Sequence, residues 1–180
     1  KIDTVNPAAL GADTVINSLN MTTTNTQNRV LNLGTATRKL TVGSGGIISS
    51  ARNHSINNGI LTSGSSELVV SVMSNQLTVN SQIQGTGMSL TKGGAGLLIL
   101  TNTNSYDGRT YINNGTLRIS SQANLGVTPG AYVADQLQIN GGALQIANSM
   151  TLSANRGISI GAAGGRIEVG TANSNVYNVT

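Results

Sequence analysis

Short apolar packets recur along this chain, and their internal spacing constrains the fold more than any other feature. In each packet, aliphatic side chains stand two positions apart, which is the period of a β-strand. The packets are Leu40 and Val42, Leu68 with Val70 and Val72, Leu77 and Val79, Leu98 and Leu100, Leu117 and Ile119, Leu137 and Ile139, Leu144 and Ile146, Met150 and Leu152, Ile158 and Ile160, and Ile167 and Val169. In the second half of the chain they start about six to nine residues apart, which is too close for intervening helices.

Three such strands with their turns would make one coil of about 20 to 25 residues, a length typical of repeat units. The sequence therefore predicts an all-β fold, a right-handed parallel β-helix (β-solenoid). About seven to nine coils would fit in residues 1–180, which we interpret as one module without an internal linker. No helix longer than one turn is expected. The best helical candidate is residues 7–10, and Pro129 marks an irregular excursion within residues 126–135.

Asparagine and glycine separate the packets, because both residues tolerate the positive φ angles of tight turns. Residues 57–59, 113–115 and 140–142 have similar sequences, which predicts three versions of one corner. An Asn-Gly pair is also a hairpin signal, so an antiparallel β-sandwich is the alternative fold. We favour the solenoid because the corner recurs with the same sequel, and because each predicted strand has only about three to five residues.

The core must be aliphatic, since aromatic residues make up 2% of the chain and both Phe and Trp are absent. Such packets suit a narrow interior of stacked, similar side chains. Tyr106 is expected to cover the edge of this core with its hydroxyl at the surface.

The net charge is +4 and the pI is about 9.9, but the ten basic residues are scattered. They form no run longer than two and are not interleaved with stacking aromatics, so we expect no nucleic acid as a partner. No apolar run approaches the roughly 20 residues of a membrane helix, so we expect no membrane insertion by this segment. The absence of cysteine excludes disulfides and thiolate metal sites.

No catalytic, metal or cofactor site is predicted. The acids are Asp3, Asp13, Glu67, Asp107, Asp135 and Glu168, and no two lie within one strand of each other. Because a glycosidase needs two carboxyls about 5 to 10 Å apart, only stacking across coils could build one. Asp107 and Arg109 share a turn and form the best catalytic candidate, with a solvated corner as the alternative. His54, beside Asn53 and Ser55, is interpreted as a surface polar residue.

Residues 90–117 have a specific order of glycines, aliphatics, asparagines and one tyrosine. This order resembles the autotransporter-associated β-strand repeat of bacterial surface passengers. The matching positions are Leu90, Lys92, Gly94, Gly96, Leu98, Leu100, Thr101, Asn104, Tyr106, Gly108, Thr110, Ile112, Gly115, Thr116 and Leu117. The best-matching repeat spans residues 90–126, while Leu97, Asn102 and Arg109 depart from the usual pattern. The resemblance implies that the module is a fragment of a longer repetitive passenger, and the family has no generic active site.

We therefore expect a non-enzymatic structural module of a secreted or surface-displayed bacterial protein, located extracellularly or at the outer cell surface. It would act as a stalk or scaffold for adhesion or cell aggregation. Its Asn, Ser and Thr content suits weak multivalent contact with a glycan or another cell-surface ligand, or self-association through the solenoid ends or faces. One alternative is an extracellular fibre subunit that stacks end to end. A carbohydrate-active β-helix enzyme is another.

Overall fold

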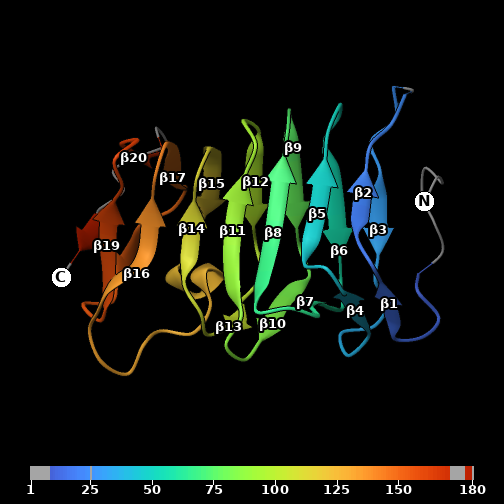
Figure 1. The fold of residues 1–180 in the computed structure, drawn as a ribbon, viewed down its shortest axis with the longest axis horizontal. Helices are drawn as coiled ribbons and strands as arrows, with labels where there is room; N and C mark the ends of the chain where they lie inside the picture. The colour runs from blue at the N-terminus through green and yellow to red at the C-terminus, as the bar shows by residue number, and fades with distance from the viewer. Residues whose placement is uncertain (1–8, 25, 171–176, 180) are drawn as a thin grey trace.

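The computed structural model describes residues 9–24, 26–170 and 177–179, and they form one stack of coils along a single axis (Figure 1). Each regular coil contributes one strand to each of three sheets, and every strand pairing is parallel. Parallel pairing between coils excludes the antiparallel sandwich, because hairpin-connected strands would pair antiparallel. The predicted β-solenoid class is confirmed, while the right-handed sense of the coil stays a prediction.

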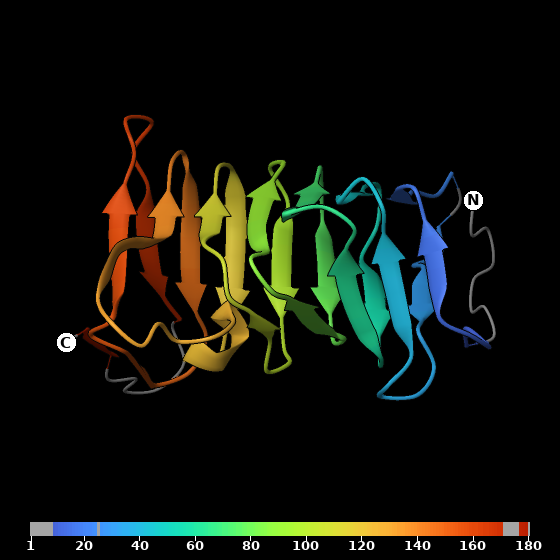
Figure 2. The ribbon, with the colours of Figure 1, turned by 60° about the horizontal axis from the view of Figure 1, so that its bottom comes forward.

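Sheet A lies at the bottom of Figure 1 and comes forward in Figure 2, whereas sheets B and C form the two long faces. Sheet A contains β1 (Thr14–Ile16), β4 (Lys39–Val42), β7 (Ile60–Ser63), β10 (Gln82–Gly85) and β13 (Ser105–Tyr106). Sheet B contains β2 (Leu19–Met21), β5 (Gly46–Ser49), β8 (Glu67–Val72), β11 (Ser89–Gly93), β14 (Thr110–Ile112), β16 (Val133–Ile139) and β19 (Arg156–Ile160). Sheet C contains β3 (Val30–Asn32), β6 (His54–Asn57), β9 (Gln76–Val79), β12 (Leu97–Leu100), β15 (Gly115–Ile119), β17 (Gly142–Ile146) and β20 (Arg166–Val169). A separate pair joins β18 (Met150–Leu152) to β21 (Tyr177–Val179).

The register between coils gives the coil length directly. Leu77 pairs with Leu98, 21 positions further on, and Leu98 pairs with Leu117 after 19 positions. Irregular coils are longer, since Leu117 pairs with Leu144 after 27 positions. Sheets B and C each have seven strands, so the described residues contain the lower number of coils that the sequence predicts.

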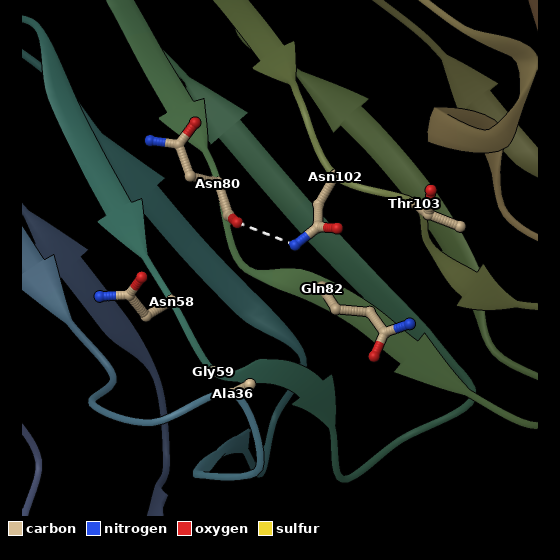
Figure 3. Close-up of a pocket in the computed structure, with 7 residues that line it drawn as sticks. All are labelled: Ala36, Asn58, Gly59, Asn80, Gln82, Asn102 and Thr103. Carbon is tan, nitrogen blue, oxygen red and sulfur yellow. Dashed lines mark hydrogen bonds between the residues drawn. The ribbon is translucent and has the colours of Figure 1, made fainter.

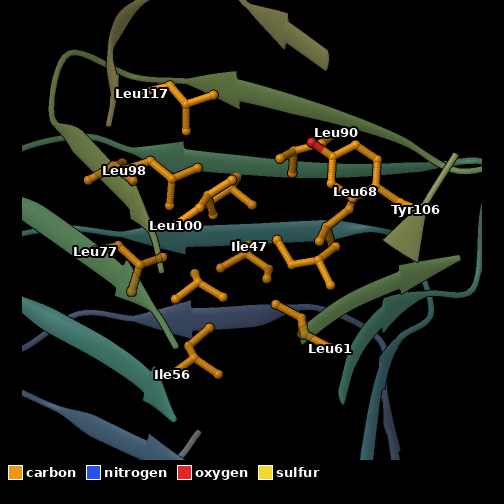
Figure 4. Packing of buried hydrophobic residues seen from close by; sticks show 14 of the residues in the cluster. Ile47, Ile56, Leu61, Leu68, Leu77, Leu90, Leu98, Leu100, Tyr106 and Leu117 are labelled. Carbon is orange, nitrogen blue, oxygen red and sulfur yellow. The ribbon is translucent and has the colours of Figure 1, made fainter. Parts of the chain in front are cut away.

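Stacked aliphatic side chains fill the interior (Figure 4). Leu77, Leu98 and Leu117 occupy the same register position on successive strands of sheet C, and all three are fully buried. Burying one such side chain contributes about 1.5–3 kcal/mol relative to leaving it exposed. The interior is thus a continuous apolar column, which holds each coil to its neighbours.

Sheet A stops at β13, and its place in the next coil is taken by a 3₁₀ turn, η1 (Gln122–Leu125). The Ser121 hydroxyl oxygen accepts the N–H of Ala123, and Asn124 Oδ1 accepts the N–H groups of Ser120 and Ser121. The expectation of no helix longer than one turn therefore holds for the described residues. The predicted excursion follows η1 and ends where β16 begins at Val133, two residues earlier than the sequence suggested.

The three Asn-Gly corners are not all the same corner. Residues 113–115 and 140–142 both join sheet B to sheet C, and their glycines pair in register. Residues 57–59 instead join sheet C to sheet A, so that part of the prediction is wrong. Sequence similarity failed here because any tight turn with positive φ selects the same residue types.

Two of the predicted packets are strands but are only partly buried. Ile160, Ile167 and Val169 are about half exposed, although Ile167 and Val169 occupy the inward register of sheet C. No further strand of sheet C covers β20 among the described residues. Residues 7 and 8 of the helical candidate lie outside the described residues, as do 173–176 and 180 at the C-terminal end.

Candidate functional site

Asparagines line the corner at which the chain leaves sheet C. Asn32, Asn57, Asn58, Asn80, Asn102 and Asn124 form this asparagine column, which runs through five successive coils. Asn58 Nδ2 donates to Asn32 Oδ1 at 3.0 Å, and Asn80 Nδ2 donates to Asn57 Oδ1 at 2.7 Å. Asn102 Nδ2 then donates to the Asn80 carbonyl at 3.0 Å. The column ties neighbouring coils together through amides, which can donate and accept at once.

A groove of about 350 Å³ opens along the asparagine column (Figure 3). Its lining consists of Ala36, Asn58, Gly59, Asn80, Gln82, Asn102 and Thr103. The lining therefore holds no charged side chain and no aromatic ring. Asn58, Asn80 and Thr103 are exposed, and Gln82 and Asn102 are half-buried. Such a surface can exchange hydrogen bonds with neutral polar ligands, and it has no group for acid–base chemistry.

Lys92 is the most unusual polar residue of the interior, since it occupies an inward position of β11 with no exposed surface. Its ammonium donates to the carbonyls of Gly93 and Gly94, both at 2.6 Å, and to the Asn114 carbonyl at 3.0 Å. Three donors thus meet three carbonyl oxygens. Burial lowers the pKa of Lys92 from 10.5 to about 8. The Lys92 side chain therefore connects the turn between sheets B and C in one coil to the equivalent turn in the next coil.

Gly115 closes the same corner, and the backbone there requires glycine. Its φ is +63°, and a Cβ at this position would lie 2.4 Å from the Gly96 carbonyl oxygen and 2.5 Å from that of Gly94. The conformation and the close contact both exclude a side chain. Gly94, Gly96 and Gly115 are thus explained by coils that stack closely at this corner.

Asn104 links three coils from a buried position. Its Oδ1 accepts the Ile83 N–H at 2.8 Å on one side, and its Nδ2 donates to the Asn124 carbonyl at 2.6 Å on the other. Tyr106 is also wholly buried, and its hydroxyl pairs with Thr110 Oγ1 at 2.8 Å. Burial raises the pKa of Tyr106 to about 12. The expectation of a surface hydroxyl is wrong, because the neighbouring Thr110 supplies a buried partner that a single sequence does not reveal.

Arg156 anchors the excursion from inside the stack. Its guanidinium donates to the carbonyls of Leu125, Gly126 and Val127 at 2.9 to 3.2 Å, and the side chain is buried. Asn155 Nδ2 adds a bond to the Pro129 carbonyl at 2.9 Å. The loop that leaves η1 is therefore held at several carbonyls, which replace the ladder bonds of the missing sheet A strand.

His54 is buried in β6, so its interpretation as a surface residue is wrong. Its Nδ1 accepts the Arg29 N–H at 2.8 Å, and its Nε2 lies 2.9 Å from the Ser50 carbonyl, which only a donor can satisfy. The ring is thus neutral with the proton on Nε2. Burial is the main cause that lowers the pKa of His54 below 6.5. The flanking Asn53 and Ser55 hid this position, because residues on both sides of an inward strand residue face outward.

Asp107 and Arg109, the catalytic candidate, are not brought together as an acid–base pair. Asp107 Oδ1 accepts the Gly87 N–H at 2.5 Å, whereas Arg109 pairs with Asp135 at 3.0 Å. The Arg109–Asp135 pair raises the pKa of the Arg109 guanidinium, because the carboxylate accepts a hydrogen bond from it. Asp107 therefore supports a turn, and Arg109 joins the corner to β16.

The other acids of the described residues also have structural partners. Asp13 accepts the Lys39 N–H at 3.0 Å, and Glu67 accepts the Thr91 hydroxyl. Glu168 pairs with Arg166 and accepts Gln145 Nε2 at 3.4 Å. Among the residues that the structure describes, no three His, Cys, Asp or Glu side chains gather into a metal-binding group. No helix in the described part of the chain is long and apolar enough to cross a membrane.

Parts of the chain are similar to a known protein family and to a known bacterial protein. Residues 90–119 match the family described as Passenger-associated-transport-repeat (PATR). Over 87 residues, or 48% of the chain, the sequence is 41% identical to the Adhesin BmaC autotransporter of Brucella suis biovar 1 (strain 1330). The chain spans 2% of the length of that relative. None of the solved structures matches the chain.

The repeat match coincides with the predicted motif and with the part of the fold that the motif builds. Residues 90–119 begin within β11 and end with β15, so they contain β12, β13 and β14 with the Lys92 and Gly115 corners. The resemblance that the sequence predicts is confirmed: residues 90–119 match the passenger-associated transport repeat, and they lie within a parallel β-solenoid.

Proposed function

We propose that this chain is a non-catalytic stalk segment of a surface-displayed or secreted bacterial adhesin. The observation that carries the proposal is the continuous parallel pairing of sheets B and C, in which seven strands of each sheet stack over one apolar column. A rod of this kind can hold another part of a protein away from the cell. The named relative, an adhesin autotransporter, supports the same role.

The acids and basic residues also favour a structural role over catalysis. Asp107, Arg109 and Asp135 serve a turn and an ion pair, and His54 is held inside the stack. A hydrolytic site would need carboxyls that converge on an open cleft. The groove along the asparagine column contains none.

Substitutions in two sets of residues on the same three strands of sheet C test the stalk role. Leu77, Leu98 and Leu117 face inward, while their chain neighbours Thr78, Ile99 and Arg118 face outward in the same register. Each triplet is replaced by serine in the full surface protein, and cell adhesion and surface display are measured. The proposal predicts that the inward variant loses display and adhesion and that the outward variant keeps both. Loss of adhesion by a folded, displayed outward variant would instead make this face a binding surface.

We further propose that the groove is where a neutral, hydroxyl-rich ligand such as a glycan contacts the rod. Its amides come from successive coils, so contacts could repeat along an extended chain. Gln82 and Gln84 provide the matched test, since both are on β10 but only Gln82 lines the groove. On a glycan array, the Gln82→Ala substitution should weaken binding and Gln84→Ala should not. Equal binding by the two variants would remove the groove from the account and leave the stalk role intact.

A further inference from the structure

The chain contains three Asn-Gly pairs, and their local geometries differ sharply. Intramolecular attack by a glycine nitrogen on the preceding asparagine amide needs the two groups to be in contact and free to react. At Asn114, the Gly115 nitrogen lies 2.7 Å from Asn114 Oδ1. This places the nitrogen beside Cγ, the carbon that carries Oδ1. Asn114 is also exposed, so water reaches the corner.

In the other two Asn-Gly pairs, hydrogen bonds to neighbouring coils direct the asparagine side chain or the glycine nitrogen away from this reactive contact. Asn140 Oδ1 accepts the Ala163 N–H at 2.8 Å, and the Gly141 N–H donates to the Gly164 carbonyl at 2.6 Å. Asn58 Nδ2 is bonded to Asn32 Oδ1 at 3.0 Å, which directs this amide toward the neighbouring coil. The residue type is therefore common to all three corners, but the reactive arrangement belongs to Asn114.

We infer that Asn114 is a site of spontaneous deamidation, built into the sheet B to sheet C corner of the transport repeat. The Gly115 nitrogen loses its proton to solvent and bonds to Asn114 Cγ. The bond from Cγ to Nδ2 breaks, and Nδ2 leaves as ammonia, which gives a succinimide. One water molecule then opens the ring to an aspartyl or isoaspartyl residue. The net change consumes one water, releases one ammonia and converts a neutral amide to a carboxylate.

Lys92 biases the direction of ring opening. Its ammonium donates to the main-chain oxygen of Asn114 at 3.0 Å and so polarises that carbonyl. Attack of water on this carbon leaves the Gly115 nitrogen on the side-chain carbonyl, which is the isoaspartyl product. The freed α-carboxylate then lies beside the Lys92 ammonium. Isoaspartate is thus favoured at Asn114, and a new ion pair replaces the hydrogen bond.

The test follows the conversion of all three asparagines in one sample. The folded 180-residue chain and the same chain in concentrated urea are incubated at neutral pH, and peptide mapping by mass spectrometry measures each Asn-Gly pair. In the folded chain, Asn114 should convert at least about tenfold faster than Asn140, because only Asn114 is positioned for attack. In urea the three rates should converge. Conversion of folded Asn114 no faster than that of Asn140 would overturn the inference.

The product ratio tests the role assigned to Lys92. The isoaspartyl share at Asn114 should be higher in the folded chain than in urea, and the Lys92→Met substitution should lower it toward the urea value. The comparison of folded and unfolded wild-type chain does not depend on whether that variant folds. An isoaspartyl share that is the same in the folded chain and in urea would contradict the role of Lys92, whatever the rate.

Discussion

The Lys92 ammonium donates to the main-chain carbonyl of Asn114, which lies one coil further along the solenoid. Replacing Lys92 with methionine keeps a similar apolar stem but removes the donor to three main-chain carbonyls. We expect the Lys92→Met substitution to lower the free energy of unfolding by about 1–3 kcal/mol. Denaturant unfolding measures the change. Exposed Lys39 is the control, and Lys39→Met should stay within about 0.5 kcal/mol of wild type.

The same lysine predicts how stability depends on alkaline pH. Burial lowers the pKa of Lys92 from 10.5 to about 8. Between these values the unfolded state binds more protons than the folded state, so the free energy of unfolding should rise as the pH increases from about 8 to about 10. Above about 10 the buried Tyr106, with its pKa raised to about 12, adds the opposite slope. Unfolding at several pH values should show the rise in wild type and not in Lys92→Met. A rise of equal size in both would exclude Lys92 as its source.

His54 predicts a second pH effect, in the acid range. Because burial lowers the pKa of His54 below 6.5, the unfolded state takes up a proton where the folded state does not. Stability should therefore be fully present above pH 6.5 and should fall as the pH drops below it. His54 is the single histidine of the chain, so the slope from about pH 6.5 to about 5 reports on it alone. The slope should vanish in His54→Gln, and its persistence would mean that other groups cause it.

Alanine substitutions at Gly115 and Gly87 distinguish two ways in which a side chain would destabilise these turns: an unfavourable backbone conformation and a steric clash with the neighbouring coil. Both have positive φ, at +63° and +68°, but a Cβ would meet carbonyl oxygens at Gly115 and open space at Gly87. Gly87→Ala should cost about 1–2 kcal/mol from the backbone conformation alone. Gly115→Ala should cost more, since the two coils must also move apart. Thermal unfolding of both variants measures the difference, and equal losses would show that the coils do not stack closely there.

The sequence predicts the solenoid well wherever a strand carries two inward aliphatics. Strands such as β9 and β12 are visible because Leu77 with Val79, and Leu98 with Leu100, repeat at period two. Strand β10 has only Ile83 buried among its four residues, and β13 has two residues in all. A single inward side chain defines no period, so these two strands of sheet A could not be located from one sequence.

Buried polar residues were hidden for a different reason. Lys92 and His54 look solvated by residue type, and only the coils above and below supply the carbonyls and the N–H that satisfy them. The asparagine column has the same property, because its partners are about 20 residues apart in the sequence. To predict which residues contact each other between coils, the length of every coil must be known, and this length varies because some coils are irregular. The sequence therefore shows which residues form turns, but it does not show their hydrogen-bond partners in the neighbouring coils.

Adding coils tests the central claim, that this chain is a rod assembled from interchangeable turns. Leu90 follows Leu68 by 22 positions in register, so copies of residues 68–89 can be inserted before Leu90 without changing the pairing. Small-angle X-ray scattering then measures the longest dimension, and circular dichroism measures the β content per residue. Three extra copies should lengthen the rod by about 14 Å, one strand spacing for each, with unchanged β content per residue. A chain that unfolds, or that broadens without lengthening, would contradict the account.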